Sequence, residues 1–125
     1  MFINLSNHQS DKWGNTQLES ALALTTDNQI KDIQFPAVPA TATTDDIIMI
    51  ANGLYHTVME NKPEVVMIAG EFSLAYTLIE LCLRAGVKVV AACSDRRTKE
   101  TVNQDGTVTK TVNFEFIQFR EFPKL

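Results

Sequence analysis

Short apolar strands that each run into a polar loop constrain the fold of this chain most strongly. Three such strands end in the loops Ser6-Asn7-His8-Gln9-Ser10, Gly70-Glu71-Phe72-Ser73 and Ser94-Asp95-Arg96-Arg97. The runs Glu64–Ala69 and Val87–Cys93 are continuously apolar, which is typical of parallel strands buried on both faces. Because parallel strands need long crossover connections, usually helices, the sequence predicts an α/β fold.

Helical patterns separate these strands. Thr16-Gln17-Leu18-Glu19 has the form of a capping box, and Thr43 followed by Asp46 predicts the start of a second helix. A third helix, at about residues 72–85, is apolar nearly all round. We expect the sheet to cover one of its faces, and a second layer or another subunit to cover the other.

A β-hairpin is predicted near the end of the chain, over about residues 97–119. Its turn is Asn103-Gln104-Asp105-Gly106, in which Asp-Gly is a strong hairpin signal. Val112, Phe114 and Phe116 alternate on one face, whereas Ile117 and Phe119 take the other. This switch indicates a β-bulge, or an arm whose two ends bury different faces.

The predicted order is β-α-β-α-β-α-β followed by the antiparallel hairpin. Right-handed crossovers turn this order into a three-layer α/β/α sandwich with a mostly parallel sheet, formed by residues 1–125 as a single domain. We expect the strand order 2-1-3-4, with the hairpin extending one edge. Ligands of such sheets bind beyond the carboxyl ends of the strands, where the strand order reverses. Here that point falls between the first and third strands.

Composition excludes several classes of partner. The net charge is −4, which argues against polymeric nucleic acid and anionic membranes as partners. No segment approaches the roughly 20 apolar residues of a membrane span, and Met1–Leu5 lacks the basic region of a signal peptide. Cys82 and Cys93 have no disulfide or zinc spacing and are interpreted as reduced thiols, which predicts a cytoplasmic protein.

The loop after the first strand holds the candidate catalytic residues His8 and Ser6. Histidine can act as a general acid or base at neutral pH, while Ser6, Asn7 and Ser10 can hold an anion with side chains and amides. The alternative is that Ser6 and Asn7 cap a turn and that His8 is merely exposed.

The other two loops hold the remaining candidate ligand-binding residues. Gly70 would let a ligand approach the backbone, and Glu71 and Ser73 are either ligand contacts or caps of the third helix. In the last loop, Ser94, Asp95, Arg96 and Arg97 could bind phosphate or carboxylate through the arginine forks. The alternative there is that one arginine pairs with Asp95 and the other is solvated.

Several well-known motifs are absent from the chain. It has no G-x-G-x-x-G, P-loop or nucleophile elbow, and no Cys/His spacing for a metal, so no cofactor and no metal site is predicted. His56 is expected to be structural, and Trp13 to pack against the start of the first helix.

The opening Phe2-Ile3-Asn4-Leu5-Ser6-Asn7-His8, followed by Thr16-Gln17-Leu18-Glu19, resembles the small Rossmann-like proteins encoded with type III CRISPR systems. These are the ring nucleases and their relatives in the CARF (CRISPR-associated Rossmann fold) superfamily. The resemblance implies a homodimer that binds a cyclic oligoadenylate at paired switch-point loops and cleaves it without metal. Ser6, Asn7 and His8 would then cradle ribose and phosphate, and Arg96 or Arg97 would offset the charge of the transition state.

Three other functions fit the same residues. The first is a nucleotide sensor of the same fold that binds without cutting. The second is a small enzyme acting on a sugar phosphate or nucleotide, with Glu71 on a ribose hydroxyl. The third is a structural partner of a larger complex, with the third helix and the arm Phe114–Phe119 as its interface.

Overall fold

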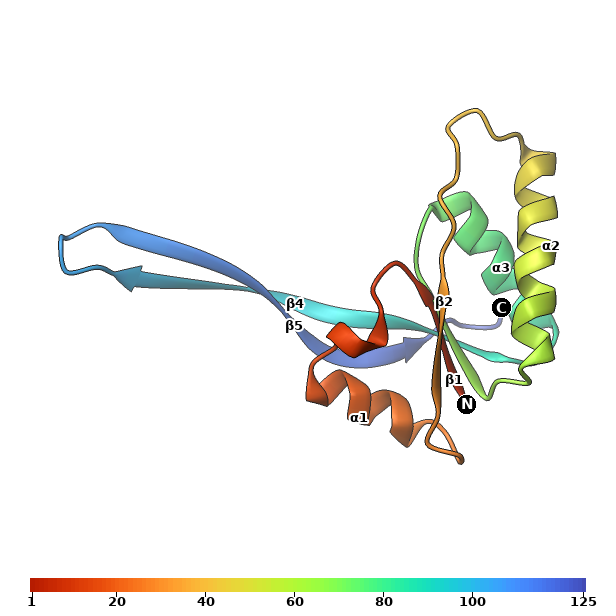
Figure 1. Cartoon of the computed structure of the whole chain (residues 1–125), viewed down its shortest axis with the longest axis horizontal. Helices are drawn as coiled ribbons and strands as arrows, with labels where there is room; N and C mark the ends of the chain where they lie inside the picture. Colours follow the sequence, from red (N-terminus) through yellow and green to blue (C-terminus); the bar gives the residue numbers. More distant parts are fainter.

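The chain forms one five-stranded mixed sheet with helices on both of its faces (Figure 1). This computed structural model describes all 125 residues. The elements are β1 (Phe2–Ser6), a 3-10 turn η1 (Ser10–Lys12), α1 (Asn15–Ala23), β2 (Ile30–Gln34), α2 (Thr44–Glu60), β3 (Val65–Ile68), α3 (Phe72–Arg84), β4 (Lys88–Val102) and β5 (Val108–Glu121).

The sheet has the strand order β2-β1-β3-β4-β5. β1 pairs in parallel with β2 and with β3, and β3 pairs in parallel with β4, while β4 and β5 are antiparallel. The predicted α/β class, the mostly parallel sheet and the hairpin at one edge are therefore confirmed.

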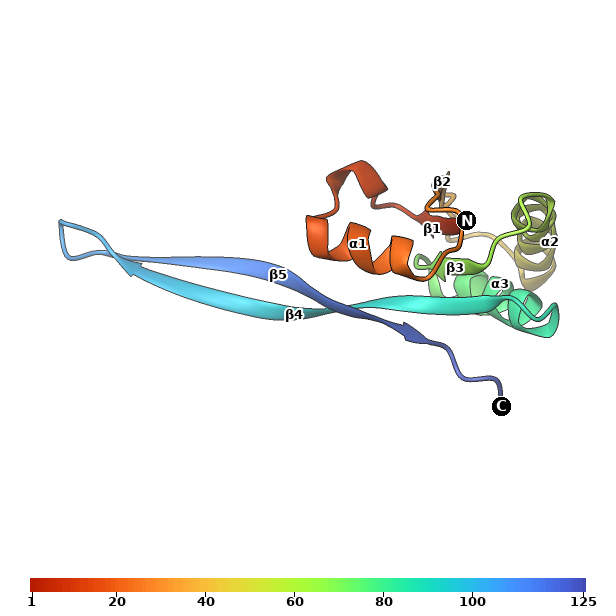
Figure 2. The ribbon, with the colours of Figure 1, turned by 90° about the horizontal axis from the view of Figure 1, so that it is seen from below.

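The core is divided between the two faces of the sheet. On one face, Leu74 and Leu78 of α3 and Ala51 of α2 pack against Ile3 and Val66. On the other face, α1 covers a smaller cluster. This cluster contains Phe2, Trp13, Ala21, Val65, Met67 and Val90. Figure 2 shows α1 on the opposite side of the sheet from α2 and α3.

One of the two predicted helix starts is correct. At α2 the Thr43 hydroxyl accepts from the Asp46 amide (3.1 Å) and the Asp46 carboxylate accepts from the Thr43 amide (2.9 Å). The capping box predicted at Thr16 is wrong. α1 already begins at Asn15, its N-cap is Gly14 and no side chain caps it, so Thr16 lies inside the helix and cannot cap.

The largest departure from the sequence-based expectation is the length of β4 and β5. The predicted loop Ser94–Arg97 is strand, because β4 continues through it and pairs with β5 up to Val102. The predicted turn is confirmed, with the Asn103 amide donating to the Thr107 carbonyl (2.8 Å). The predicted bulge is also present, between Cys93 and Ser94, where Ile117 is the unpaired residue on β5.

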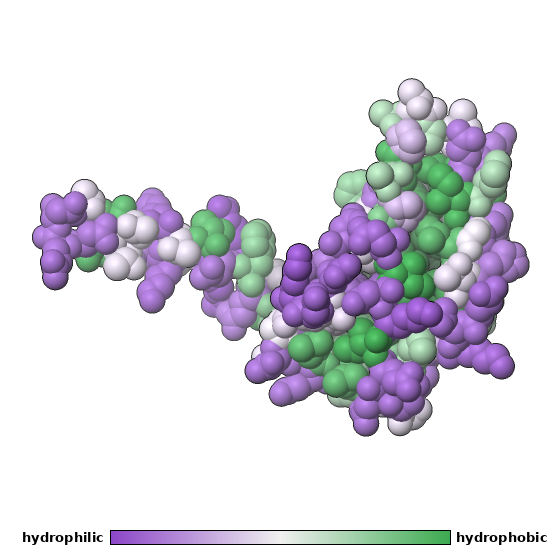
Figure 3. All heavy atoms as spheres, viewed as in Figure 1, coloured by the Kyte–Doolittle hydropathy of each residue, from purple (hydrophilic) through white to green (hydrophobic).

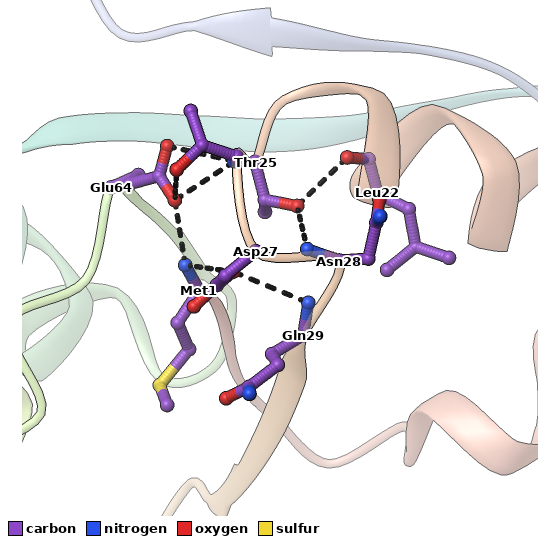
Figure 4. Close-up of polar contacts among 8 residues, drawn as sticks. Met1, Leu22, Thr25, Asp27, Asn28, Gln29 and Glu64 are labelled. Carbon is purple, nitrogen blue, oxygen red and sulfur yellow. Dashed lines mark hydrogen bonds and ion pairs between the residues drawn. The ribbon is translucent and has the colours of Figure 1, made fainter.

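Two ion pairs lie at the amino-terminal edge of the sheet (Figure 4). The Met1 ammonium lies 2.7 Å from an Asp27 oxygen and 2.9 Å from a Glu64 oxygen. Burial lowers the pKa of the Met1 amino group, but the hydrogen bonds to Asp27 and Glu64 outweigh it, so the pKa is raised above 8.0. These pairs link the start of β1 to the segments that precede β2 and β3.

Both cysteines are free, Cys82 buried and Cys93 half-buried. Burial raises the pKa of the Cys82 thiol to about 11, so it packs as a small apolar side chain. No helix of the chain has the length and apolar character needed to cross a membrane.

Candidate functional site

The ends of β1, β2 and β3 meet at the carboxyl-terminal edge of the sheet. The Ala69 amide donates to the Leu5 carbonyl (3.1 Å), and the Phe35 amide donates to the Ser6 carbonyl (3.2 Å). The strand order reverses between β1 and β3, because the chain moves from β1 outward to β2 and then back past β1 to β3. This is the topology in which open α/β sheets bind ligands.

A buried asparagine fixes the loop after β1. Asn4 is 1% exposed, and its amide nitrogen donates to the His8 carbonyl (2.9 Å) and to Asp32 (2.8 Å). Its side-chain oxygen accepts a hydrogen bond of 2.6 Å from the Ser6 hydroxyl. The Trp13 indole donates to the same His8 carbonyl (3.2 Å), so the loop folds back over the end of its own strand.

This network gives the candidate residues of the loop different roles. Ser6 is 7% exposed, and its hydroxyl both donates to Asn4 and accepts from the His8 amide (3.2 Å). The Ser10 hydroxyl and amide are both bound to the Asp32 carboxylate (2.9 and 3.2 Å). Asn7 accepts from Gln34 (2.6 Å) and is exposed, as is the His8 side chain. Of the candidate residues of this loop, the exposed ones are therefore Asn7 and His8.

In the loop after β3, Glu71 is the N-cap of α3. Its carboxylate accepts from the amides of Ser73 (3.0 Å) and Leu74 (2.9 Å), and the Ser73 hydroxyl adds a further bond of 2.7 Å. The hydrogen bonds from the Leu74 and Ser73 amides, followed by that of the Ser73 hydroxyl, lower the pKa of Glu71 below 4.5. The helix-cap alternative therefore describes Glu71 and Ser73 in this structure, and the amino terminus of α3 already holds a negative charge.

Gly70 is required by packing. A Cβ atom at this position would lie 2.4 Å from the ring of Phe35, which comes from the end of β2 and is 2% exposed. The ring fills the Cβ side of Gly70, while the residue itself stays exposed and lines a groove.

Ser94, Asp95, Arg96 and Arg97 lie along β4 beyond the bulge and not in a strand-end loop. Arg97 pairs with Asp95 (3.4 Å) and with Glu115 across the ladder (3.1 Å). The expectation that these four residues form a strand-end loop is wrong, because β4 continues through them and pairs with β5.

A groove of about 820 Å³ adjoins the loop after β3 and runs along α3. Its wall includes Ile68–Gly70, the α3 side chains Phe72, Tyr76, Ile79 and Leu83, and residues 122–125. Phe72 is 90% exposed and Tyr76 is 70% exposed. The outer face of α3, which the sequence predicted to be covered, is thus open and aromatic.

Two features of this edge were not singled out from the sequence. Asn4 and Asp32 hold the first loop, and the aromatic side chains of α3 border the groove. An asparagine inside the apolar run Phe2–Leu5 was the available signal, because such a residue is rare in a buried strand and needs partners.

A model of the family described as "Uncharacterized protein MJ1673 family" matches residues 1–120. The comparisons matched no curated protein and no solved structure.

Proposed function

The chain belongs to the MJ1673 family, and we propose that it is a Rossmann-like protein that binds a small nucleotide-type ligand, specifically a cyclic oligoadenylate, at the edge formed by β1 and β3. The observation that carries the proposal is the reversal of strand order between β1 and β3, with exposed Asn7 and His8 on a loop fixed from below by Asn4. A fixed loop binds without first being ordered, which lowers the entropic cost of binding.

The groove along α3 suits the bases of such a ligand. Its size lies within the range of about 300–1,000 Å³ that is usual for small-molecule sites. Phe72 and Tyr76 offer exposed rings directly after the β3 loop, and stacking on an aromatic ring stabilises a base by about 1–3 kcal/mol. In the proposed complex the loops contact ribose and phosphate, and α3 contacts adenine.

We further propose that binding, without cleavage, is the main activity. Ser6 is buried and already bonded, Arg97 is paired with two carboxylates on the hairpin, and Arg96 lies within β4 and not in a strand-end loop, so none of the three supports a developing charge at this edge. His8 alone remains as a candidate proton acceptor. This favours the sensor over the ring nuclease and over an enzyme acting on a sugar phosphate.

The test is calorimetric titration with cyclic oligoadenylates of several ring sizes, a linear oligoadenylate, AMP and a sugar phosphate, followed by mass spectrometry of each mixture. We expect the cyclic ligands to bind, and the mass spectra to show them intact. His8→Ala and Phe72→Ala should each weaken binding about tenfold. His56→Ala is the matched control, because His56 is the other histidine and is exposed on α2.

Absence of binding by every cyclic oligoadenylate would overturn the proposal. Tight binding of AMP or the sugar phosphate alone would instead favour a small enzyme that acts on a sugar phosphate or nucleotide. Linear products that disappear in His8→Ala would identify the chain as a ring nuclease with His8 as the catalytic residue.

A further inference from the structure

The hairpin of residues 94–116, here called the arm, projects well beyond the helices (Figures 1 and 2). Residues that pair across an antiparallel ladder share a face, so the register sorts the arm into two faces. One face holds the pairs Ser94/Phe116, Arg96/Phe114, Thr98/Val112, Glu100/Lys110 and Val102/Val108. The other face holds only polar residues, in the pairs Asp95/Glu115, Arg97/Asn113, Lys99/Thr111 and Thr101/Thr109.

The apolar face of the arm is open in the single chain. Phe114 and Val102 are each 74% exposed, and Figure 3 shows hydrophobic atoms among the hydrophilic ones along the arm. An isolated two-stranded ribbon is marginally stable in water, and a row of exposed apolar side chains marks an interaction surface. This face therefore needs a cover that the chain itself does not supply.

The apolar face continues the core on the α1 side of the sheet. The ring centroids of Phe116 and Phe119 are 4.9 Å apart. The Phe119 ring in turn packs near the rings of Phe2 and Trp13, with centroid distances of 5.1 and 6.1 Å. The bulge at Ile117 makes this possible, because a regular ladder would put Phe116 and Phe119 on opposite faces.

We propose that a second copy of this chain covers the apolar face, with two arms packed face to face and antiparallel about a two-fold axis through the Thr98/Val112 pair. The charges on the face carry this assignment. Under such rotation Arg96/Phe114 of one copy lies against Glu100/Lys110 of the other. Arg96 has no ion pair within its own chain, and its counterpart in the dimer is the Glu100 carboxylate, which pairs in its own chain with Lys110 at 3.5 Å.

The apolar residues match under the same rotation. Phe116 at the base of one arm meets Val102 and Val108 at the tip of the other, and Thr98/Val112 meets itself. The self-complementary pattern of charge and apolar surface is what a two-fold contact requires. A different protein that covered this face would need charged and apolar side chains in the same order along its surface.

A parallel arrangement of the two arms is blocked by α1. Packed sheets lie about 10 Å apart, which is about the diameter of one helix. Since α1 stands on the apolar-face side of each copy, two bodies at the same end would place two helices in that gap. The antiparallel arrangement places the two bodies at opposite ends of the paired arms.

The test is sedimentation equilibrium of the ligand-free protein, which does not depend on the proposed nucleotide site. We expect a dimer, with Arg96→Glu and Glu100→Arg each raising its dissociation constant at least tenfold, because two symmetric copies of a like-charge contact form. The double variant R96E/E100R should restore the dimer. Lys99→Glu is the matched control for Arg96→Glu, because it makes the same change of charge on the polar face. It should leave the dimer intact.

Circular dichroism of each variant checks that these exposed substitutions keep the fold. A wild-type chain that stays monomeric at all concentrations would overturn the proposal and assign the face to a different protein. Single variants that dissociate without rescue by the double variant would overturn the antiparallel register. If the wild-type chain bound nucleotide as a monomer, the proposed function would hold and the proposed dimer would be wrong.

Discussion

At the scale of single residues, Glu71 links the candidate site to the stability of α3. Its carboxylate holds two backbone amides at the start of the helix, and these bonds lower its pKa below 4.5. A carboxyl group with a lowered pKa in the folded state stabilises the fold above its unfolded pKa. That stabilisation is lost as the pH falls through the folded value.

We therefore expect Glu71→Ala to lower the free energy of unfolding at neutral pH, and the difference from wild type to shrink as the pH falls below about 4.5. Urea denaturation over a pH series measures this difference. Glu19→Ala is the control, because it removes the same charge from an exposed position with no hydrogen-bond partner. A difference that stayed constant down to strongly acidic pH would show that the Glu71 carboxylate does not act as a charged cap.

At the scale of secondary-structure elements, the bulge decides which way the arm faces. One residue inserted between Cys93 and Ser94 would give Ile117 a partner and restore a regular ladder. Phe116, Phe114 and Val112 would then turn to the opposite face, away from Phe119, because side chains alternate with a period of two. Deletion of Ile117 also restores a regular ladder, but it leaves those rings on their present face.

Nuclear Overhauser contacts between the Phe116 and Phe119 rings should thus disappear on insertion and persist on deletion. Their present centroid distance of 4.9 Å is short enough for strong contacts. Contacts that survived the insertion would show that β5 slips in register to keep its apolar face toward α1.

The secondary-structure elements also show which features local sequence patterns predict. The apolar runs and crossovers predicted the parallel sheet and its strand order, and Asp105-Gly106 predicted the turn of the hairpin. The end of β4 was placed too early, because Ser94–Arg97 is polar and its place in a strand depends on Glu115 and other partners across the ladder. Pairing between residues so far apart in sequence leaves no local signature in β4 itself.

The candidate site was predictable to the same degree. Topology brings the loops after β1 and β3 to one edge, as expected from the strand order alone. The inward turn of Ser6, the Phe35 ring over Gly70 and the cap formed by Glu71 depend on side-chain packing between separate segments. A single sequence does not encode those contacts as a pattern.

At the scale of the whole molecule, the chain has a packed body and an arm that shares little of its core. The body buries Phe2, Ile3, Leu74 and Leu78 completely, whereas nearly every residue of the arm is exposed. Segments with few buried contacts open at lower free energy than the core of the same protein. The amides of the arm should therefore exchange with solvent much faster than those of β1 and β3 in the single chain.

Dimer formation through the arm makes this exchange depend on concentration. At a total protein concentration about 100 times the dissociation constant, about one chain in fifteen remains monomeric, so exchange through the monomer is slowed about fifteenfold. Hydrogen exchange read by mass spectrometry should show this slowing in peptides from residues 94–116 and no change in peptides from β1 or β3. In Arg96→Glu the same slowing should require a protein concentration at least ten times higher. Slow exchange of the arm in dilute wild-type protein would mean that the ribbon is stable by itself, and the physical argument for a partner would fail.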